Sequence, residues 1–213
     1  MPNVAIVDYG GSNLLSVQRA INKCNSDVFI SSNPQLILKA SHVLLPGVGA
    51  VSNAMSALKR DGLDQVIKEV ASQGTPLLGI CLGMQLLLEE SEEFGLTPTL
   101  GLIKGRVVPI PNLTTFGLPL KIPNIGWSRI HPPNTSISWT SSILDRINTV
   151  DSFYFVHSYM ACPRNREDIL AVSNYGGNMI SAALNVGNVF GCQFHPEKSG
   201  EIGLKVLNNF INL

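Results

Sequence analysis

The sequence has little charge and no long apolar run. Lys and Arg number 15, as do Asp and Glu, so charged residues are 14% of the chain and the formal net charge is zero. Neither sign forms a long block, which argues against nucleic-acid and anionic-membrane partners. Gly, Pro, Asn or a charged residue interrupts each apolar stretch before the roughly 18 to 20 residues that a membrane helix needs. We therefore expect no membrane span.

The sequence is also poor in cysteine. Its four cysteines, Cys24, Cys81, Cys162 and Cys192, are scattered and lack the paired spacing of a zinc site, so we expect neither a metal nor another cofactor. Residues 1–8 show no basic and apolar segments of a signal peptide. We expect a cytoplasmic protein whose thiols stay reduced, with Cys24, Cys162 and Cys192 filling space in the structure.

What is present indicates a single α/β domain over residues 1–213, with a central, mostly parallel sheet flanked by helices. In the first half, short apolar runs alternate with helical patterns, which is typical of a parallel sheet with crossover helices. Asn13 is expected to cap the first helix. The strands expected are Val4–Val7, Val28–Ile30, His42–Leu45 and Pro76–Ile80, and the helices are Ala50–Lys59, Leu63–Ser72 and one that begins at Cys81.

After Glu93 the sequence changes character, because Pro and Gly become frequent between short strand-like runs. Such a pattern favours an antiparallel, strand-rich second half. The strands expected there are Ile103–Ile110, Ile125–Ile130, Phe153–Met160, Ile169–Tyr175, Met179–Leu184 and Val189–Phe194, and a last helix spans Glu201–Ile211.

A candidate nucleophile lies where an apolar strand meets a helix, in Gly79-Ile80-Cys81-Leu82-Gly83. The pattern copies the G-x-S-x-G nucleophile elbow with sulfur in place of oxygen. A helix N-terminus favours the reactive thiolate, and the N–H of Leu82 would face a developing oxyanion. A single cysteine is more often an inert core residue, but the flanking glycines and the strand-to-helix position favour the nucleophile.

A base and its orienting carboxylate are supplied by His195-Pro196-Glu197, which follows an apolar strand. The proline keeps the chain extended, so that residues two apart project to the same side, and Glu197 can fix the tautomer of the imidazole. Gly47-Val48-Gly49, at the end of another strand, offers backbone N–H groups for an oxyanion hole. Taken alone, the latter segment is more often an ordinary glycine-rich turn.

Together these motifs resemble the class I, triad-type glutamine amidotransferases, and within them the glutaminase subunits of imidazole glycerol phosphate synthase. The relatives of guanylate and anthranilate synthesis usually carry Pro-Gly-Pro-Gly in place of Pro46–Gly49. The resemblance runs nearly end to end, through Asp8–Gly10 with Asn13, Pro46–Ala50, Gly79–Gln85, Ser91–Glu93, Ile125–Trp127, Tyr154–Tyr159 and Phe194–Ser199.

The resemblance implies a glutaminase with a Cys81–His195–Glu197 triad. L-glutamine would be hydrolysed to glutamate and ammonia through a Cys81 thioester. The further roles implied are an oxyanion hole at Val48, Gly49 and Leu82, glutamine binding by Gly47, Gln85, Glu93, Ser158 and Tyr159, and partner contact by Asn13, Trp127 and Tyr154.

The resemblance also implies a partner, since the chain contains no synthase domain. Ammonia would pass to a separate (β/α)8-barrel cyclase in a 1:1 heterodimer, which makes imidazole glycerol phosphate and an aminoimidazole carboxamide ribonucleotide in histidine biosynthesis. The family's usual Pro-His-Met-Gly-Trp-Asn is here Pro123 to Ser128, with Asn124 and Ser128 as departures. These departures keep open an alternative, a paralogous subunit that supplies ammonia for amidation of a surface-polysaccharide sugar.

Two alternatives from other functional classes also remain at this stage. A cysteine peptidase or small-molecule hydrolase on a similar sheet would usually lack the Gly-Met-Gln that follows Leu82 here. A regulatory binding subunit with a vestigial triad would not need Cys81, His195 and Glu197 together. Formation of a thioester with a glutamine analogue separates these classes.

Overall fold

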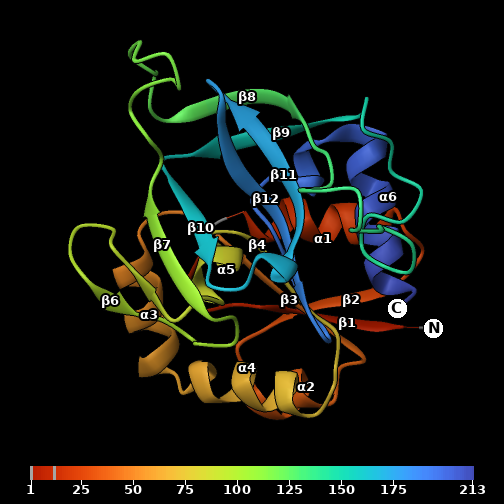
Figure 1. Cartoon of the computed structure of the whole chain (residues 1–213). Helices are drawn as coiled ribbons and strands as arrows, with labels where there is room; N and C mark the ends of the chain where they lie inside the picture. The colour runs from red at the N-terminus through yellow and green to blue at the C-terminus, as the bar shows by residue number, and fades with distance from the viewer. Residues whose placement is uncertain (1, 12) are drawn as a thin grey trace.

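A seven-stranded sheet forms the centre of the computed structural model, which describes residues 2–11 and 13–213 (Figure 1). Its strand order is β11-β12-β13-β4-β3-β1-β2, in which β13, β4, β3, β1 and β2 run parallel and β12 is antiparallel to both of its neighbours. The strands are β1 (Asn3–Val7), β2 (Asp27–Ser31), β3 (His42–Gly47), β4 (Leu77–Cys81), β11 (Ile169–Tyr175), β12 (Asn178–Val186) and β13 (Val189–Cys192).

Helices cover both faces of this sheet because alternate strand residues point to opposite sides. Val4 and Ile6 pack into one apolar cluster with α1 (Leu14–Asn22) and α6 (Gly200–Ile211). Ala5 and Val7 pack into the other cluster. The second cluster includes residues of α2 (Pro34–Leu38), α3 (Val51–Arg60), α4 (Leu63–Ser72) and α5 (Leu82–Leu86).

The second half of the chain adds two small sheets beside the carboxyl end of the large one. A four-stranded sheet has the order β10-β7-β5-β6, and a two-stranded sheet pairs β8 with β9 in antiparallel register. These strands are β5 (Glu90–Ser91), β6 (Thr97–Pro98), β7 (Gly105–Pro109), β8 (Asn124–Arg129), β9 (Ser152–His157) and β10 (Tyr159–Pro163), with 3-10 turns η1 (Arg166–Asp168) and η2 (Pro196–Lys198).

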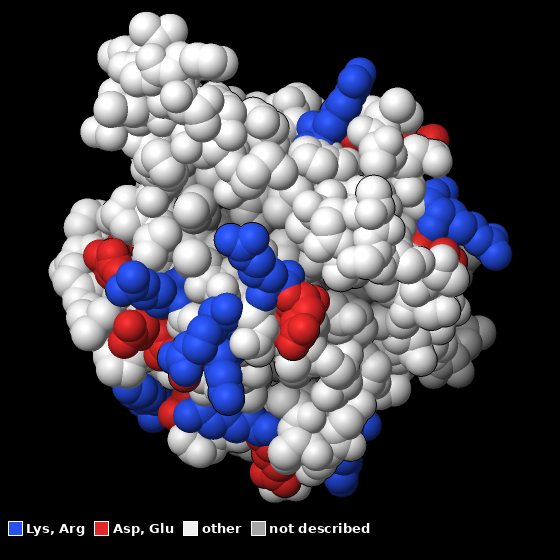
Figure 2. Space-filling model, viewed as in Figure 1, with Lys and Arg blue, Asp and Glu red and all other residues white. Residues whose placement is uncertain are grey.

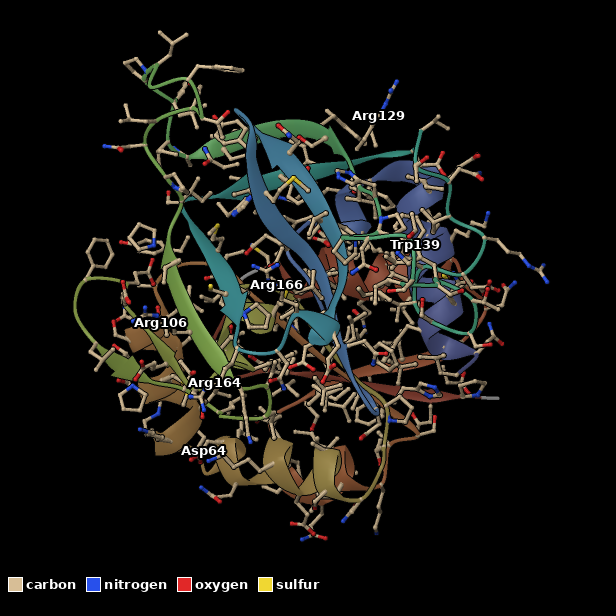
Figure 3. All side chains as sticks on the ribbon, in the orientation of Figure 1. Asp64, Arg106, Arg129, Trp139, Arg164 and Arg166 are labelled. Atoms are coloured by element: carbon tan, nitrogen blue, oxygen red, sulfur yellow. The ribbon has the colours of Figure 1, made fainter. Side chains whose placement is uncertain are left out.

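A long connection between β8 and β9 is fixed to the body of the protein by Trp139, which is labelled in Figure 3. The indole is buried, and its Nε1 donates to the carbonyl oxygen of Leu170 at 2.8 Å. Ile143 and Leu144, also buried, continue the contact with the cluster that holds α6. This packing anchors the end of β8 and the start of β9, which the loop connects.

The charged side chains in view gather over the four-stranded sheet (Figure 2). Arg106, Arg164 and Arg166, labelled in Figure 3, belong to this group. Arg106 pairs with Glu92 at 3.1 Å and Arg164 with Glu89 at 3.0 Å. The upper left part of the same view, where the loop before β8 and the start of β8 lie, shows no charged side chain, whereas Arg129 at the end of β8 projects at the top.

The predicted strands of the first half are confirmed, and the differences have local causes. The helix α2 was not predicted although Asn33 caps it, accepting from the N–H of Gln35 at 2.9 Å, and Pro34 begins it. Asn13 occupies the N-cap position of α1 as predicted, but the capping bond expected of its side chain is absent. Its backbone has φ 75° and ψ 9°, in the left-handed region.

In the second half, the predicted strand Phe153–Met160 is two strands that belong to different sheets. They separate at Ser158, which lies between β9 and β10. The strand expected from Ile103 begins only at Gly105. The expectation of antiparallel pairing holds for most pairs, but β13 joins β4 and β5 joins β7 in parallel. The pairing with β4 places the segment after β13 beside Cys81.

No helix within residues 2–11 and 13–213 is long and apolar enough to cross a membrane.

Candidate active site

Cys81 lies at a sharp turn between β4 and α5, with φ 54° and ψ −109°. An L-residue pays a conformational cost in such a conformation, which persists only where the surroundings enforce it. The enforcing contacts come from two glycines. A Cβ on Gly79 would lie 2.6 Å from the backbone of Gly83, and one on Gly83 would lie 1.7 Å from the carbonyl oxygen of Leu45. Only glycine at both positions lets α5 pack this close to β3 and β4, so the sequence pattern builds the turn.

His195 and Glu197 form a buried pair beside this turn. His195 Nδ1 and Glu197 Oε1 are 2.8 Å apart, and the two side chains are 2% and 0% exposed. The backbone N–H of His195 donates to the carbonyl oxygen of Tyr154, and Ser199 Oγ donates to the carbonyl oxygen of His195, so both backbone polar groups of His195 are fixed. A neutral ring bonded this way carries its proton on Nδ1, which leaves Nε2 as the free base.

The free Nε2 of His195 is buried and has no hydrogen-bond partner among the described residues. It lines the same cavity as Cys81. Burial lowers the pKa of His195, but the hydrogen bond to Glu197 and the nearby charges of Cys81 and Glu197 outweigh it and raise this pKa to about 9. The ring is therefore equipped to take a proton from a neighbouring thiol and to hold it as an imidazolium.

Asn13 supports the same pair, although the sequence indicated it as a helix cap. Its Nδ2 donates to Glu197 Oε1 at 2.6 Å, the oxygen that also contacts His195. The left-handed backbone at Asn13, which asparagine tolerates better than most residues, accompanies this contact. A separation of 184 positions between Asn13 and Glu197 explains why no local pattern could reveal it.

A cavity of about 360 Å³ opens in front of Cys81 and His195. Its volume is at the lower end of the range for small-molecule sites. Most of the predicted oxyanion-hole and substrate-binding residues line it, namely Val48, Gly49, Leu82, Gln85, Glu93, Ser158 and Tyr159. The lining also includes four residues that the sequence did not indicate, Pro123, Val156, His157 and Lys198.

Gly47 is the one predicted substrate-binding residue that does not line this cavity. It ends β3 opposite Cys81 in the parallel register. A Cβ there would lie 2.5 Å from the hydroxyl of Tyr9 and 3.0 Å from the Cβ of Leu82. Gly47 therefore acts through close packing behind the cavity wall, and the prediction that it binds glutamine is not supported by its position.

This fold is shared with a known family. The family model for class-I glutamine amidotransferases matches residues 5–213. The chain belongs to the class-I glutamine amidotransferases. The predictions of the family and of the fold class are thereby confirmed.

Full-length relatives of this amidotransferase carry a more specific name. The subunit HisH 1 of imidazole glycerol phosphate synthase from Legionella pneumophila (strain Lens) is 45% identical over 213 residues, which cover 100% of each chain. A subunit HisH from Geobacillus sp. (strain WCH70) is 44% identical over 99% of this chain and 96% of its own.

Solved structures share the fold of the amidotransferase. A structure described as PurLQS from Thermotoga maritima has a TM-score of 0.73 and 18% identity, covering 99% of this chain and 98% of its own. A structure described as a glutamine amidotransferase has a TM-score of 0.73 and 14% identity, over 99% of each chain. At these identities the likeness shows the architecture.

Tyr9 is a structural residue of the amidotransferase site that sequence reasoning missed. It is 4% exposed, and its hydroxyl donates to the carbonyl oxygen of Pro46 at 3.0 Å. Burial is the main cause that raises the pKa of this hydroxyl, with a further contribution from the charge of Cys81. Tyr9 therefore remains protonated and fixes the segment that leads into Val48 and Gly49.

The residues predicted for partner contact gather around the triad of the amidotransferase. Trp127 on β8 is 58% exposed and packs edge-on against Tyr154 of β9, with ring centroids 6.0 Å apart. The ring of Tyr154 lies 6.5 Å from that of His195, and Lys198 Nζ lies 6.0 Å from its centroid. Asn13 contacts Glu197 from the other side. Tyr154 therefore lies between His195 and the exposed surface that includes Trp127.

The other cysteines differ in their surroundings. Cys192 is buried in β13, where burial raises the pKa of its thiol well above the ordinary range. Cys24 is half-buried and donates to the carbonyl oxygen of Ala20. The prediction that Cys162 fills space is wrong, because it is exposed at the edge strand β10. The described part of the chain contains no group of three His, Cys, Asp or Glu residues placed to bind a metal ion.

Proposed function

We propose that this chain is the glutaminase subunit of an imidazole glycerol phosphate synthase and acts in histidine biosynthesis in the cytoplasm. It would act as one amidotransferase domain spanning residues 1–213. The observation that supports the proposal is the cavity lined by both Cys81 and His195, whose Nε2 has no partner among the described residues and whose Nδ1 is paired with Glu197. The full-length relatives named as HisH subunits support the choice of pathway.

The reaction begins with proton transfer from Cys81 to Nε2 of His195, and the thiolate then attacks the side-chain amide carbon of glutamine. The tetrahedral intermediate places negative charge on the former amide oxygen. Backbone N–H groups are assigned to bind this oxyanion. They belong to Val48, Gly49 and Leu82, which line the cavity. His195 then returns its proton to the departing nitrogen, and ammonia leaves a thioester on Cys81.

Hydrolysis of the thioester uses the same groups in reverse. His195 takes a proton from water, the hydroxide attacks the thioester carbon, and glutamate leaves as the thiol is restored. Glu197 keeps the proton on Nδ1 and stabilises the imidazolium in both halves. Asn13, which donates to the same carboxylate oxygen, holds Glu197 in place between the two steps.

The amino-acid end of glutamine is assigned to Gln85, Glu93, Ser158 and Tyr159, which line the cavity. Glu93 is the acidic residue of the lining and is suited to the α-ammonium group. In the structure Glu93 Oε2 accepts from the N–H of Val51, the first residue of α3, at 2.6 Å. The α-ammonium group of bound glutamine would therefore share the Glu93 carboxylate with the backbone N–H of Val51.

A separate (β/α)8-barrel cyclase is the proposed partner, in a 1:1 complex through a surface that includes Asn13, Trp127 and Tyr154. Ile125 and Trp127 are 56% and 58% exposed on the same strand, and exposed tryptophan is enriched at interaction surfaces. The upper left of Figure 2, where β8 begins, shows no charged side chain. Ammonia would pass from the cavity to this partner.

The sugar-amidation alternative loses support from the position of Asn124. That residue is 4% exposed and bonds His157 inside the protein. Its departure from the usual family residue therefore concerns internal packing more than partner choice. The relatives at 44% and 45% identity also carry the synthase name.

The test is complementation of cells that lack their own histidine-pathway glutaminase. We expect this chain, expressed with a barrel cyclase from the same organism, to restore growth without histidine, and Cys81→Ala to fail unless ammonium is added. Glutamine hydrolysis by the purified chain is measured in parallel. Hydrolysis without rescue would contradict the pathway, whereas hydrolysis by Cys81→Ala would contradict the triad.

A further inference from the structure

A buried amide that the triad does not include contacts the nucleophile. Gln193 follows β13 and is 0% exposed, and its Nε2 donates to Cys81 Sγ at 3.6 Å. We infer that Gln193 is a further active-site residue, which stabilises the Cys81 thiolate by donating a hydrogen bond to the sulfur. The inference rests on the proposed role of Cys81 as nucleophile.

The orientation of the Gln193 amide decides whether it supports an anion, because its oxygen end would repel the thiolate. Gln193 Oε1 pairs with Gln85 Nε2 at 3.0 Å, and the same Nε2 donates to the carbonyl oxygen of Tyr159 at 3.1 Å. A backbone carbonyl can only accept. Gln85 must therefore present its NH2 group to both neighbours, Gln193 must present its oxygen to Gln85, and the NH2 group of Gln193 is left for the sulfur.

The same carbonyl fixes a second side chain. His157 Nδ1 lies 2.8 Å from the carbonyl oxygen of Tyr159, so the proton of neutral His157 is on Nδ1. Its Nε2 then accepts from Asn124 Nδ2 at 3.1 Å. Burial lowers the pKa of His157 to about 4, against the opposing bond to Tyr159 and with a small contribution from His195. The network is neutral, and each of its links has a donor and an acceptor.

A neutral donor suits this position better than a cation would. In a buried site a hydrogen bond to an anion is about twice as strong as one between neutral groups. A lysine at the same place would also lower the basicity of the thiolate strongly, and nucleophilicity falls with basicity. The amide of Gln193 cannot titrate, so its support of the sulfur is the same at every pH at which His195 works.

Iodoacetamide alkylation of Cys81 measured against pH tests the inference without using glutamine turnover. The variants are Gln193→Met, which removes the donor at similar volume, and Gln193→Glu, which places a carboxylate oxygen beside the sulfur. Peptide mass spectrometry follows Cys81 and, as an internal control, the exposed Cys162 in the same molecules. Asn124→Ala, at the far end of the network, is the matched variant.

We expect the pH midpoint of Cys81 alkylation to rise by about one unit in Gln193→Met and by more in Gln193→Glu. The midpoints of Cys162 and of Cys81 in Asn124→Ala should stay where they are, because the carbonyl of Tyr159 alone sets the amide orientation.

Unchanged Cys81 midpoints in the folded Gln193 variants would overturn the inference. So would an equal shift at Cys162 or in Asn124→Ala. If Gln193→Met does not fold, Gln193→Glu decides alone. If the Cys81 midpoints shift in the variants but the unmodified protein does not hydrolyse glutamine, the result would instead count against the proposed function.

Discussion

The elbow at residues 79–83 and the β8–β9 ribbon (residues 124–129 and 152–157) border the same cavity, yet they are built differently. The elbow is buried in the large sheet, and its glycines contact backbone atoms of neighbouring elements. The β8–β9 ribbon forms a two-stranded sheet of its own and exposes Ile125 and Trp127. A Cβ on Gly126, in the middle of β8, would meet nothing within 4 Å.

The comparison separates two requirements on one site. A nucleophile in a strained conformation needs neighbours that cannot move, and the large sheet provides them. A surface for a partner needs exposed apolar area, which a thin two-stranded sheet provides at little cost to the core. The four predictions that follow test this division, beginning with the largest expected effect.

Glu197→Gln should have the largest effect because it acts within the embedded half of the site. The amide at position 197 no longer fixes the proton on Nδ1 of His195, so the free base is lost in part of the molecules. We expect the glutaminase kcat with partner present to fall on the order of 10⁴-fold, with little change in folding stability. Glu201→Gln, at an exposed position in the first turn of α6, is the control. A loss below tenfold at position 197 would contradict the triad.

Gly83→Ala tests the rigidity of the elbow against that of the β8–β9 ribbon. The added methyl group would lie 1.7 Å from the carbonyl oxygen of Leu45, so β3 and α5 must separate. We expect a loss of more than about 4 kcal/mol in the free energy of unfolding. Gly126→Ala meets only the backbone strain of φ 150° and should cost about 1 to 2 kcal/mol. Urea denaturation compares the two, and equal costs would remove the distinction between the regions.

His157, at the end of β9 where the two regions meet, should make stability depend on pH. Its folded-state pKa of about 4 lies below the ordinary value of 6.5, because burial disfavours the charged ring. The unfolded chain therefore binds the proton more tightly, and the stability present above pH 6.5 is lost as the pH falls through 4. We expect this loss to be about 3 kcal/mol.

Urea denaturation between pH 4 and 7 measures this loss, and His157→Asn is the matched variant without a titratable ring. The acid limb should be shallower in the variant. The raised pKa of His195 acts in the opposite sense, so its stabilisation is fully present below pH 6.5 and is lost as the pH rises from there through about 9, above nearly all of the window measured. Parallel acid limbs in the two proteins would contradict the assignment to His157.

Trp127→Ala should have the smallest effect on the isolated chain and act on the partner instead. The indole is 58% exposed, so the free energy of unfolding should change by less than about 1 kcal/mol. Loss of an anchoring tryptophan typically costs about 2 kcal/mol of binding, or roughly a 30-fold higher Kd. Leu36→Ala, 50% exposed on helix α2, is the control for calorimetric titration with the cyclase. Equal affinities in both variants would remove the β8–β9 ribbon from the interface.

The sequence predicted the features that depend on neighbouring residues. Continuous apolar runs predicted the buried parallel strands, and the glycines around Cys81 predicted the turn because close packing requires them within a span of five residues. His195 and Glu197 were predicted together because their pairing is local. The resemblance to a family supplied most of the remaining cavity residues.

The features that the sequence did not predict depend on contacts between distant segments. Asn13 reaches Glu197 across 184 positions, and Gln193 reaches Cys81 across 112. No periodic pattern marks either contact. The break of the strand at Ser158 was also missed, because the residues on both sides read as one run while pairing sends them to two sheets.

The glycine contacts of the elbow determine how this chain can diverge. In a library of all single substitutions, variants at positions 79 and 83 should be depleted by any selection for folded protein. A side chain at either position would clash with backbone atoms of a neighbouring element. Alanine or serine at position 81 should be depleted only by a selection for activity, since each is no larger than cysteine in this buried site and meets the same φ of 54° that the cysteine already adopts. A lineage that abandons the chemistry can therefore replace its nucleophile in one step, and the glycines on either side would persist as the record of a lost activity.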